Sequence, residues 1–270
     1  LRARLGAAPD AYRTHYARRL FEVLMGRPWA PEIEDELFAL LPKLAGPDEP
    51  ADGLVARVAA LHRLTDLMVE RRYEARMKGV ERPDRLTRPE LQKKQEESRR
   101  AAREGFADRL RKEAAKQPGP FTEWLKAERV WLDVTLDRDL PAAAADSWAV
   151  LAAPEPKPAP GDESAAVAAR MDELLRARAL AVLQNLAARK GADPALIDRL
   201  VKFVDAQIAA HPDAPRWRGE KYKLLIALDR PKELEAELVR WTAAADADSR
   251  WRVALGYLFA EQGKVADAIG

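Results

Sequence analysis

Histidine and serine, the side chains that most often carry acid–base or nucleophilic chemistry, are few and scattered in this chain of 270 residues. The three histidines, His15, His62 and His211, each stand alone, without a second histidine or a cysteine at the spacing of a metal site. We therefore expect each to be a surface or packed side chain. No serine lies in the G-x-S-x-G of a hydrolase nucleophile, whereas Ser164 and Ser249 have the sequence context of helix N-caps.

No other catalytic or metal-binding pattern is present. The chain has no cysteine, which excludes disulfides and thiolate metal ligands. It also lacks a glycine-rich phosphate loop and the G-x-G-x-x-G of dinucleotide sites. We therefore expect a protein that is not an enzyme and that needs no cofactor or metal. The absence of cysteine leaves the compartment open, because cysteine-free chains occur in both the cytoplasm and the periplasm.

Basic residues outnumber acidic ones in the stretch 70–117. One interpretation is a face that binds phosphate or an acidic partner. The other is a solvated pair of helices with charge pairs four residues apart, such as Glu96 with Arg100. Interleaved acids would repel phosphates, and Tyr73 and Phe106 offer little aromatic surface for stacking bases. Over the whole chain the formal net charge is only +2, so we do not expect nucleic-acid binding.

Seven tryptophans are many for this length. Trp124 and Trp131 are seven residues apart, which places them on one face of a helix. Trp217 and Trp251 are 34 residues apart, and each is followed by arginine and an amphipathic segment. We expect most of the seven to pack between helices, whereas an exposed one would be a candidate contact for a partner.

The elements that position these residues are expected to be helices almost everywhere. Alanine, leucine, arginine and glutamate dominate, glycine is sparse, and alternating β-branched runs are absent. The expected fold class is all-α, without a sheet. No apolar run approaches the roughly 20 residues that span a bilayer, so we expect no membrane span. The chain begins at Leu1, and 265–270 open a further helix, so we expect a segment of a longer protein.

Prolines, glycines and capping residues divide the chain into the expected helices. A capping box at 87–90 opens a polar helix whose large apolar residues are Leu91, Phe106 and Leu110. We expect this helix to protrude, or to pair loosely with the end of the helix before it. The proline-rich run 154–163 is the predicted domain boundary, as a linker or a long loop. The first expected helix follows Pro9 and Asp10 and stops at Gly26, and the others are 31–44, 52–78, 88–116, 121–134, 141–151, 164–190 and 194–210.

Residues 249–264 combine an apolar stripe with small residues at regular places. Leu255, Leu258 and Phe259 have helical spacing, and Gly263 suits a tight turn. The stretch resembles the first helix, turn and opening of the second helix of a tetratricopeptide repeat (TPR), whose period is also 34 residues. The matching positions are Leu255, Gly256, Phe259, Gly263, Ala268 and Ile269. The preceding unit, 215–248, keeps Leu225 where Phe259 stands, but has Lys221, Tyr222, Asp229 and Leu234 at the positions of Leu255, Gly256, Gly263 and Ala268.

This resemblance, clearest over 215–270, implies an α-solenoid of stacked antiparallel helical hairpins in a right-handed superhelix. It implies that 164–270 consists of TPR-like repeats truncated at the C-terminus. Residues 1–153 would form an N-terminal region of helical hairpins, with a long charged helix pair at 52–117.

In the resembled family, ligands usually lie in a concave groove that the first helix of each pair lines. The corresponding positions here are Arg216, Gly219, Lys223, Arg250, Val253 and Tyr257. The positions of the family's carboxylate clamp hold Lys223, Tyr257, Gly219 and Val253 instead of asparagine and lysine, so binding of chaperone tails is not expected. The resemblance implies a scaffold that binds a protein or peptide, possibly an acidic one, through Arg216, Lys223, Arg250 and Tyr257.

Two other functions stay open at this point. The helical array could be a spacer or an assembly subunit of a larger complex, docking through its aromatic-rich first half. Nucleic-acid binding through the basic helices of 70–117 is the less favoured of the two.

Overall fold

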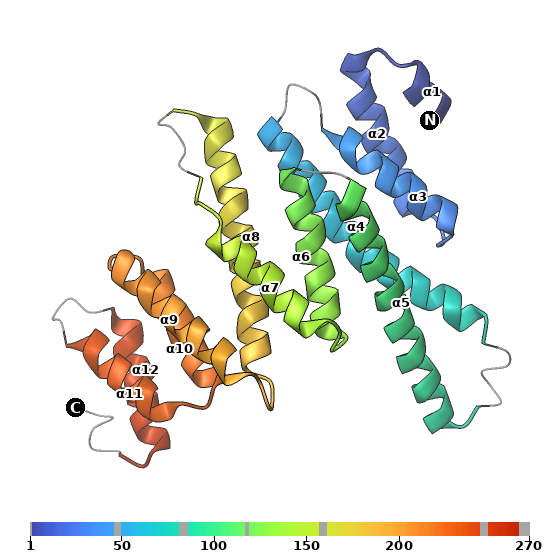
Figure 1. Ribbon diagram of the computed structural model, residues 1–270. Coiled ribbons are helices and arrows are strands. Elements are labelled where there is room, and N and C mark those ends of the chain that lie inside the picture. Colours follow the sequence, from blue (N-terminus) through green and yellow to red (C-terminus); the bar gives the residue numbers. More distant parts are fainter. Residues whose placement is uncertain are drawn as a thin grey trace. The chain divides into compact units, whose positions relative to one another are not determined.

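The computed structural model describes residues 2–45, 50–80, 86–116, 119–156, 161–243 and 248–264, without the side chains of residues 10, 11 and 50–52. Within these ranges all regular structure is helical, which confirms the expected all-α class (Figure 1). The helices are α1 (Arg2–Ala7), α2 (Asp10–Met25), α3 (Pro31–Leu40), the 3-10 helix η1 (Leu41–Leu44), α4 (Pro50–Lys78), α5 (Arg88–Lys116), α6 (Pro120–Thr135), α7 (Leu140–Ala152), α8 (Glu163–Ala187), α9 (Pro194–Ala210), α10 (Pro215–Ala227), α11 (Pro231–Thr242) and α12 (Ser249–Glu261).

The chain divides into two compact units, Leu1–Val182 and Leu183–Gly270, and the division falls inside α8. The predicted boundary at 154–163 lies earlier, and 157–160 are outside the described residues. Arg176 of α8 donates hydrogen bonds to the carbonyl oxygens of Leu151 (3.1 Å) and Ala153 (2.7 Å). These hydrogen bonds connect the helices on either side of the proline-rich run, α7 and α8, within the first unit. The interpretation of 154–163 as a linker between domains stays a prediction.

The core of the first unit is built from α2, α3, η1, α4, α5 and α6, with the first half of α8. Leu37, Leu61, Phe106 and Leu125 are almost fully buried in it. Their spacing places each on the apolar stripe of its helix, and burial of these stripes is the main force that holds the helices together. In Figure 1, α4, α5 and α6 lie side by side.

Helix α5 packs more closely than its sparse apolar stripe suggests. Its second half packs against α4 and α6, with Ala102, Phe106, Ala107 and Leu110 fully buried. The alanines allow close approach of the neighbouring helices, so few large side chains are needed. The expectation of a loosely paired helix is wrong for this half.

Aspartates, and not the predicted serines, cap two of the helices. Asp162 accepts a hydrogen bond from the amide of Ala165 (2.9 Å), and Asp248 accepts one from the amide of Arg250 (2.9 Å). Asp162 lies two residues before the predicted cap Ser164, and Asp248 lies one residue before the predicted cap Ser249. A carboxylate is favoured there because the positive end of the helix dipole attracts negative charge. The predicted box at α5 is present in part, since Glu90 accepts from the amide of Thr87 (2.8 Å).

In the second unit, the local geometry of α10 and its following turn recurs once, 34 residues later, at α12. Helix α12 has the bounds of α10 shifted by 34, and both have 13 residues. The turns that follow them match: the amide of Arg230 donates to the carbonyl of Leu225 (3.0 Å), as the amide of Lys264 does to Phe259 (2.8 Å). Asp229 and Gly263, at equivalent positions, both have positive φ, +52° and +75°. The predicted second helix of the last hairpin would include Ala268 and Ile269, which lie outside the described residues.

Candidate functional site

The four predicted partner-binding residues occupy equivalent places on α10 and α12. Arg216 and Arg250 are related by the 34-residue shift, and so are Lys223 and Tyr257. On each helix the two residues are seven apart, which places them on one face. Lys223, Arg250 and Tyr257 are exposed and Arg216 is half-buried, so all four are accessible in the second unit.

Acidic neighbours partly balance the cations of this surface. The ammonium group of Lys223 is 2.9 Å from Glu220, and the guanidinium of Arg250 is 2.5 Å from Asp248. The hydrogen bond to Asp248 raises the pKa of Arg250 and lowers that of the aspartate. The cations of both pairs are exposed, so water screens the attraction and the pairs contribute little to stability. The two cations stay accessible to a carboxylate from a partner.

An aromatic layer holds α10 and α12 next to each other. The ring of Trp251 lies 5.0 Å from Trp241 of α11 and 5.8 Å from Tyr222 of α10. Leu225, Leu234 and Leu238 complete this cluster. The rings pack at tilted angles, an arrangement that stabilises aromatic pairs. The exposed residues of α10 and α12 consequently stand on a packed base.

The same surface carries apolar side chains in contact with solvent. Tyr257 is 71% exposed and Val253 is 57% exposed on α12, while Ile226 of α10 is 53% exposed. Sequence reasoning placed Val253 and Tyr257 here and missed Ile226. The signal was available, because Ile226 follows Lys223 by three residues and continues the same helical face.

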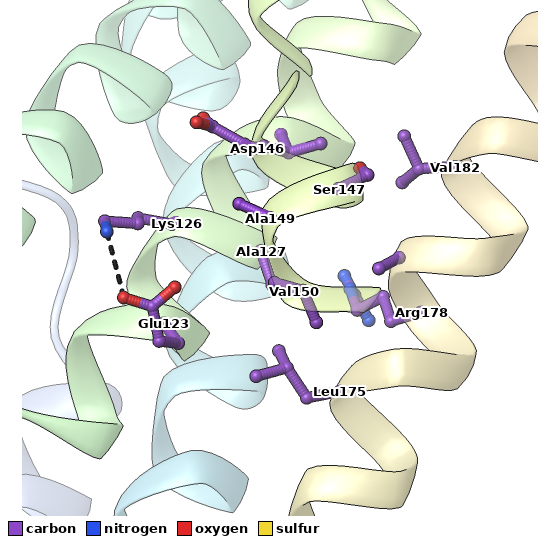
Figure 2. A pocket seen from close by; sticks show the side chains of 12 residues that line it. Glu123, Lys126, Ala127, Asp146, Ser147, Ala149, Val150, Leu175, Arg178 and Val182 are labelled. Atoms are coloured by element: carbon purple, nitrogen blue, oxygen red, sulfur yellow. Dashed lines mark hydrogen bonds and ion pairs between the residues drawn. The ribbon is translucent and has the colours of Figure 1, made fainter. Parts of the chain in front are cut away.

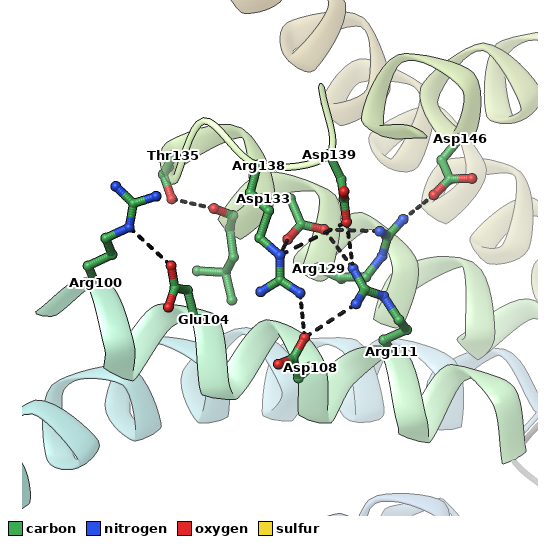
Figure 3. A network of polar contacts seen from close by, with 11 residues as sticks. Arg100, Glu104, Asp108, Arg111, Arg129, Asp133, Thr135, Arg138, Asp139 and Asp146 are labelled. Atoms are coloured by element: carbon green, nitrogen blue, oxygen red, sulfur yellow. Dashed lines mark hydrogen bonds and ion pairs between the residues drawn. The ribbon is translucent and has the colours of Figure 1, made fainter. Parts of the chain in front are cut away.

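In the first unit, the densest polar cluster is a network of arginines and aspartates on α5, α6, α7 and the α6–α7 turn (Figure 3). Asp133 is fully buried and lies 3.0 Å from Arg129 and 3.7 Å from Arg111. Arg138 contacts Asp108 at 2.6 Å. Burial raises the pKa of Asp133, and the three guanidinium groups of Arg129, Arg138 and Arg111 oppose this shift.

The guanidinium groups of this network already have carboxylate partners. Arg111 binds Asp139 at 3.0 Å and Asp108 at 3.3 Å, and Arg129 also contacts Asp146. A closed network of this kind links helices, and it leaves no cation free to hold an anionic ligand. We therefore assign it a structural role.

His62 is the one histidine with a buried carboxylate partner among the described residues. Its Nδ1 lies 2.5 Å from Oε1 of Glu128, which is 2% exposed and also lies 3.1 Å from Arg178. The imidazole packs edge-on against Trp124, with 5.6 Å between the ring centroids. Glu128 thereby joins α4, α6 and α8, which is the packed role expected for a lone histidine.

A small pocket opens beside this contact, between α6, α7 and α8 (Figure 2). Its volume is about 50 Å³, and Ala127, Val130, Leu175, Ser147 and Arg178 are among its lining residues. One water molecule occupies about 30 Å³ of liquid. This volume is far below the roughly 300–1,000 Å³ usual for organic ligands, so the pocket is on the scale of a few water molecules.

Many cations of the basic stretch 70–117 have acidic partners, either on another helix or on the same helix. Arg72 of α4 binds both carboxylate oxygens of Glu34, at 2.8 and 2.6 Å, and Arg109 of α5 binds Glu113 at 2.9 Å. Arg100 binds Glu104 at 3.0 Å instead of the predicted Glu96. These pairs favour the interpretation as charged, mutually supporting helices.

Among the tryptophans, Trp131 is the one exposed beyond a third, at 40%. The guanidinium of Arg178 lies 5.5 Å above its ring. The other six are buried or half-buried, as expected for packing between helices. Trp131 is therefore the tryptophan that a partner could contact.

The described residues contain no cluster of three or more His, Cys, Asp or Glu side chains arranged to hold a metal ion. None of their helices combines the length and apolar character that crossing a bilayer needs. Comparison of the chain with protein-family models, with curated proteins and with solved structures gave no match.

Proposed function

We propose that this chain is a non-enzymatic scaffold that binds a protein or peptide through the exposed face of α10 and α12. In this proposal the helical hairpins stack as a TPR-like α-solenoid with a right-handed superhelical course, and the first helix of each pair lines the binding groove. Arg216, Lys223, Arg250 and Tyr257 are the partner-binding residues.

The observation that carries the proposal is the exposure of Tyr257, Val253 and Ile226 on two helices that the Trp241–Trp251 cluster connects. Large apolar side chains in contact with water are favourable contacts for a partner, because binding removes their surface from solvent. A rigid base lowers the entropic cost of binding. Tyrosine is among the residues that most often dominate binding energy.

The charges of this face indicate the chemistry of the partner. Arg250 and Lys223 are exposed on the same two helices as these apolar residues, and each is paired with a half-buried acid, Asp248 or Glu220. A peptide with an acidic residue beside an apolar one would satisfy both kinds of contact. We therefore expect an acidic, partly apolar peptide segment as the ligand.

The test is a selection of displayed random peptides against the full chain, followed by fluorescence anisotropy with the enriched peptides. We expect enrichment of sequences that pair an acid with an apolar residue. Arg250→Glu and Tyr257→Ala should each weaken binding by about tenfold, the size expected for the loss of one dominant contact.

Two matched variants on α11 serve as controls. Val239→Ala removes a 49% exposed apolar side chain, and Lys232→Glu reverses an exposed charge, in both cases outside α10 and α12. Both should bind the peptides as the unaltered chain does. Equal binding by all four variants would exclude this face as the site, and the absence of any enriched peptide would oppose the scaffold function.

A second function, assembly into a larger complex, is favoured by one observation in the first unit. Trp131 is 40% exposed and Leu174 is 46% exposed, and Arg178, one turn after Leu174, lies over the Trp131 ring. Tryptophan and arginine are frequent anchors of protein interfaces. Light scattering at rising concentration should then report self-association that Trp131→Ala removes and that Val55→Ala, a change at another exposed apolar residue, preserves. A chain that stays monomeric throughout contradicts self-assembly.

A further inference from the structure

An open cavity of about 770 Å³ lies in the first unit, beside the short helix α1. Leu5 and Gly6 of α1 line it on one side, and residues of α2, α3 and η1 line the remainder. Its lining is largely apolar and includes Leu20 of α2 and Ala39 and Leu40 of α3. The surface of α2 and α3 that α1 covers, called the α1 groove below, is therefore only partly filled.

Helix α1 has few attachments to this groove. None of its six residues is buried, and Leu5 is half-buried where it packs against the core of the first unit. Six residues are well below the roughly 12–15 that an isolated helix needs in water, and Gly6 lowers the stability of the helix further. Helix α1 is therefore held by its contacts with the groove, and these are few enough for a partner to replace.

One directional contact sets the position of α1 on the groove. The guanidinium group of Arg2 donates two hydrogen bonds to the carboxylate of Glu36 on α3, at 2.6 and 2.5 Å. Such two-pronged pairs are specific in their geometry. The side chain of Arg2 is 66% exposed, so water screens the pair and it contributes little to stability. Arg2 thus orients α1 without holding it firmly.

The residue after α1 is packed more tightly than α1 itself. Ala8 is 7% exposed, and the side chain of Arg13 in α2 donates a hydrogen bond to its carbonyl oxygen at 3.1 Å. Pro9 follows with extended backbone (φ −55°, ψ 150°) and leads into α2. Helix α1 can therefore leave the groove while the chain from Ala8 onward keeps its place.

We propose that the α1 groove is a docking site for a partner helix that carries an arginine three residues before a large apolar side chain, with α1 as the resident competitor. Arg2 and Leu5 show this pattern, since the arginine pairs with Glu36 and the leucine packs against the core. Residues three apart lie on one helical face.

The unfilled part of the cavity favours a partner over α1. A Cβ placed at Gly6 would meet nothing within 4 Å, so α1 leaves space at this point of the lining. A partner helix with a side chain at the equivalent of Gly6, or with a ring in place of Leu5, would bury more apolar surface than α1 does. Because burial of apolar surface is favourable, such a helix can displace α1.

The experiment uses a fluorescent alanine-rich peptide of about 16 residues, long enough to form a helix, with arginine and phenylalanine three residues apart. Fluorescence anisotropy measures its binding to the full chain. Because α1 competes for the groove, loosening α1 should raise the apparent affinity. We expect Arg2→Ala to tighten binding by about threefold to tenfold. Arg4→Ala, at an exposed arginine of the same helix outside the cavity lining, should leave the affinity unchanged.

Reversal of the charged pair tests the role of Glu36 in the Arg2→Ala chain, where α1 no longer uses this carboxylate. Adding Glu36→Arg should reverse the preference, so that a peptide with glutamate in place of its arginine binds better than the original. Adding the milder Glu36→Gln should weaken binding of the original peptide by about tenfold. Glu32→Gln, at an exposed acid of α3 outside the lining, is the matched control. Circular dichroism checks that each variant is folded.

Four outcomes would overturn the proposal. The peptide does not bind the Arg2→Ala chain at about 1 mM, Arg2→Ala leaves the affinity unchanged, or both changes of Glu36 leave the arginine peptide preferred and equally tight. The fourth is dimers of the unaltered chain in light scattering that Arg2→Glu removes, which would assign the groove to α1 of a second copy. Arg250→Glu should not affect this peptide, so failure here is distinguishable from failure of the α10–α12 proposal.

Discussion

Single residues in the first unit are constrained by contacts that come from distant parts of the chain. Gly105 of α5 lies against Arg72 of α4, since a Cβ at this position would be 2.4 Å from an arginine nitrogen. That arginine is held by both oxygens of Glu34, to which Trp29 also donates a hydrogen bond (2.8 Å). The buried carboxylate fixes the guanidinium, so it cannot move away freely.

Gly105→Ala should therefore lower the free energy of unfolding, because the new methyl group displaces Arg72 from Glu34. Gly219→Ala is the matched change on α10, where a Cβ meets nothing within 4 Å. This second change should stabilise the chain by about 1 kcal/mol, the usual gain of alanine over glycine inside a helix. Urea unfolding measures the change in the free energy of unfolding for both variants. A Gly105→Ala variant more stable than the unaltered chain would contradict the close contact of Gly105 with Arg72.

Lys221 is the buried cation of the second unit, and its two acidic partners come from α9 and α11. Lys221→Met should destabilise this unit by about 1–3 kcal/mol, because Asp205 would lose its cation and Glu237 would keep only that of Arg240. Lys223→Met, two residues away and exposed, should have little effect. Thermal unfolding distinguishes the two, and the triple change with Asp205→Asn and Glu237→Gln should recover part of the loss.

The titration of Lys221 gives a second prediction. Burial alone would lower its pKa, but the hydrogen bonds to Asp205 and Glu237 raise it above its ordinary value of 10.5. The stabilisation is therefore complete below about pH 10.5, and it is lost as the pH rises through the folded pKa. Unfolding free energies of the unaltered chain and Lys221→Met should converge at alkaline pH. A gap that stays constant above this pH would show that the ion pair does not titrate as argued.

At the scale of elements, the turns after α10 and α12 share one backbone path with different residues. Asp229 and Gly263 both occupy the left-handed region, where a branched side chain is strained. Gly263→Val should cost about 1–2 kcal/mol, and Gly263→Asp should cost clearly less because aspartate already holds this conformation at 229. The denaturant midpoints of the two variants rank their stabilities. An equal loss of stability in Gly263→Val and Gly263→Asp would contradict a left-handed turn.

Most helices could be predicted from proline and capping signals, and the exceptions have local causes. Helix α9 has the predicted bounds, Pro194 to Ala210. The expected helix 31–44 changes into a 3-10 helix after Leu40, because Pro42 cannot donate the hydrogen bond that an α-helix needs. Burial of the second half of α5 depends on which helices lie against Ala102 and Ala107, and that information is not local.

The predicted site shows the same limit. The 34-residue spacing placed Arg216, Lys223, Arg250 and Tyr257 on equivalent faces of two helices. The equivalent position 34 residues later is the apolar Leu255. The spacing could therefore not reveal that Lys221 is buried between two acids. Such a cluster depends on side chains from three helices, so it becomes visible only in three dimensions.

At the scale of the whole molecule, the two units have separate hydrophobic clusters. One includes Leu37, Leu61 and Phe106, and the other includes Leu225, Leu238 and Trp251. Leu238→Ala, at a fully buried position of α11, should destabilise the second unit by about 2–5 kcal/mol. Hydrogen exchange should then report faster amide exchange in α10, α11 and α12, with protection of α4, α5 and α6 retained. Equal acceleration in both sets would mean that the units unfold as one.

The turns at Asp229 and Gly263 show that two different residues can hold one backbone path. A comparison of side chains alone would miss this likeness, whereas a comparison of main-chain hydrogen bonds detects it at once.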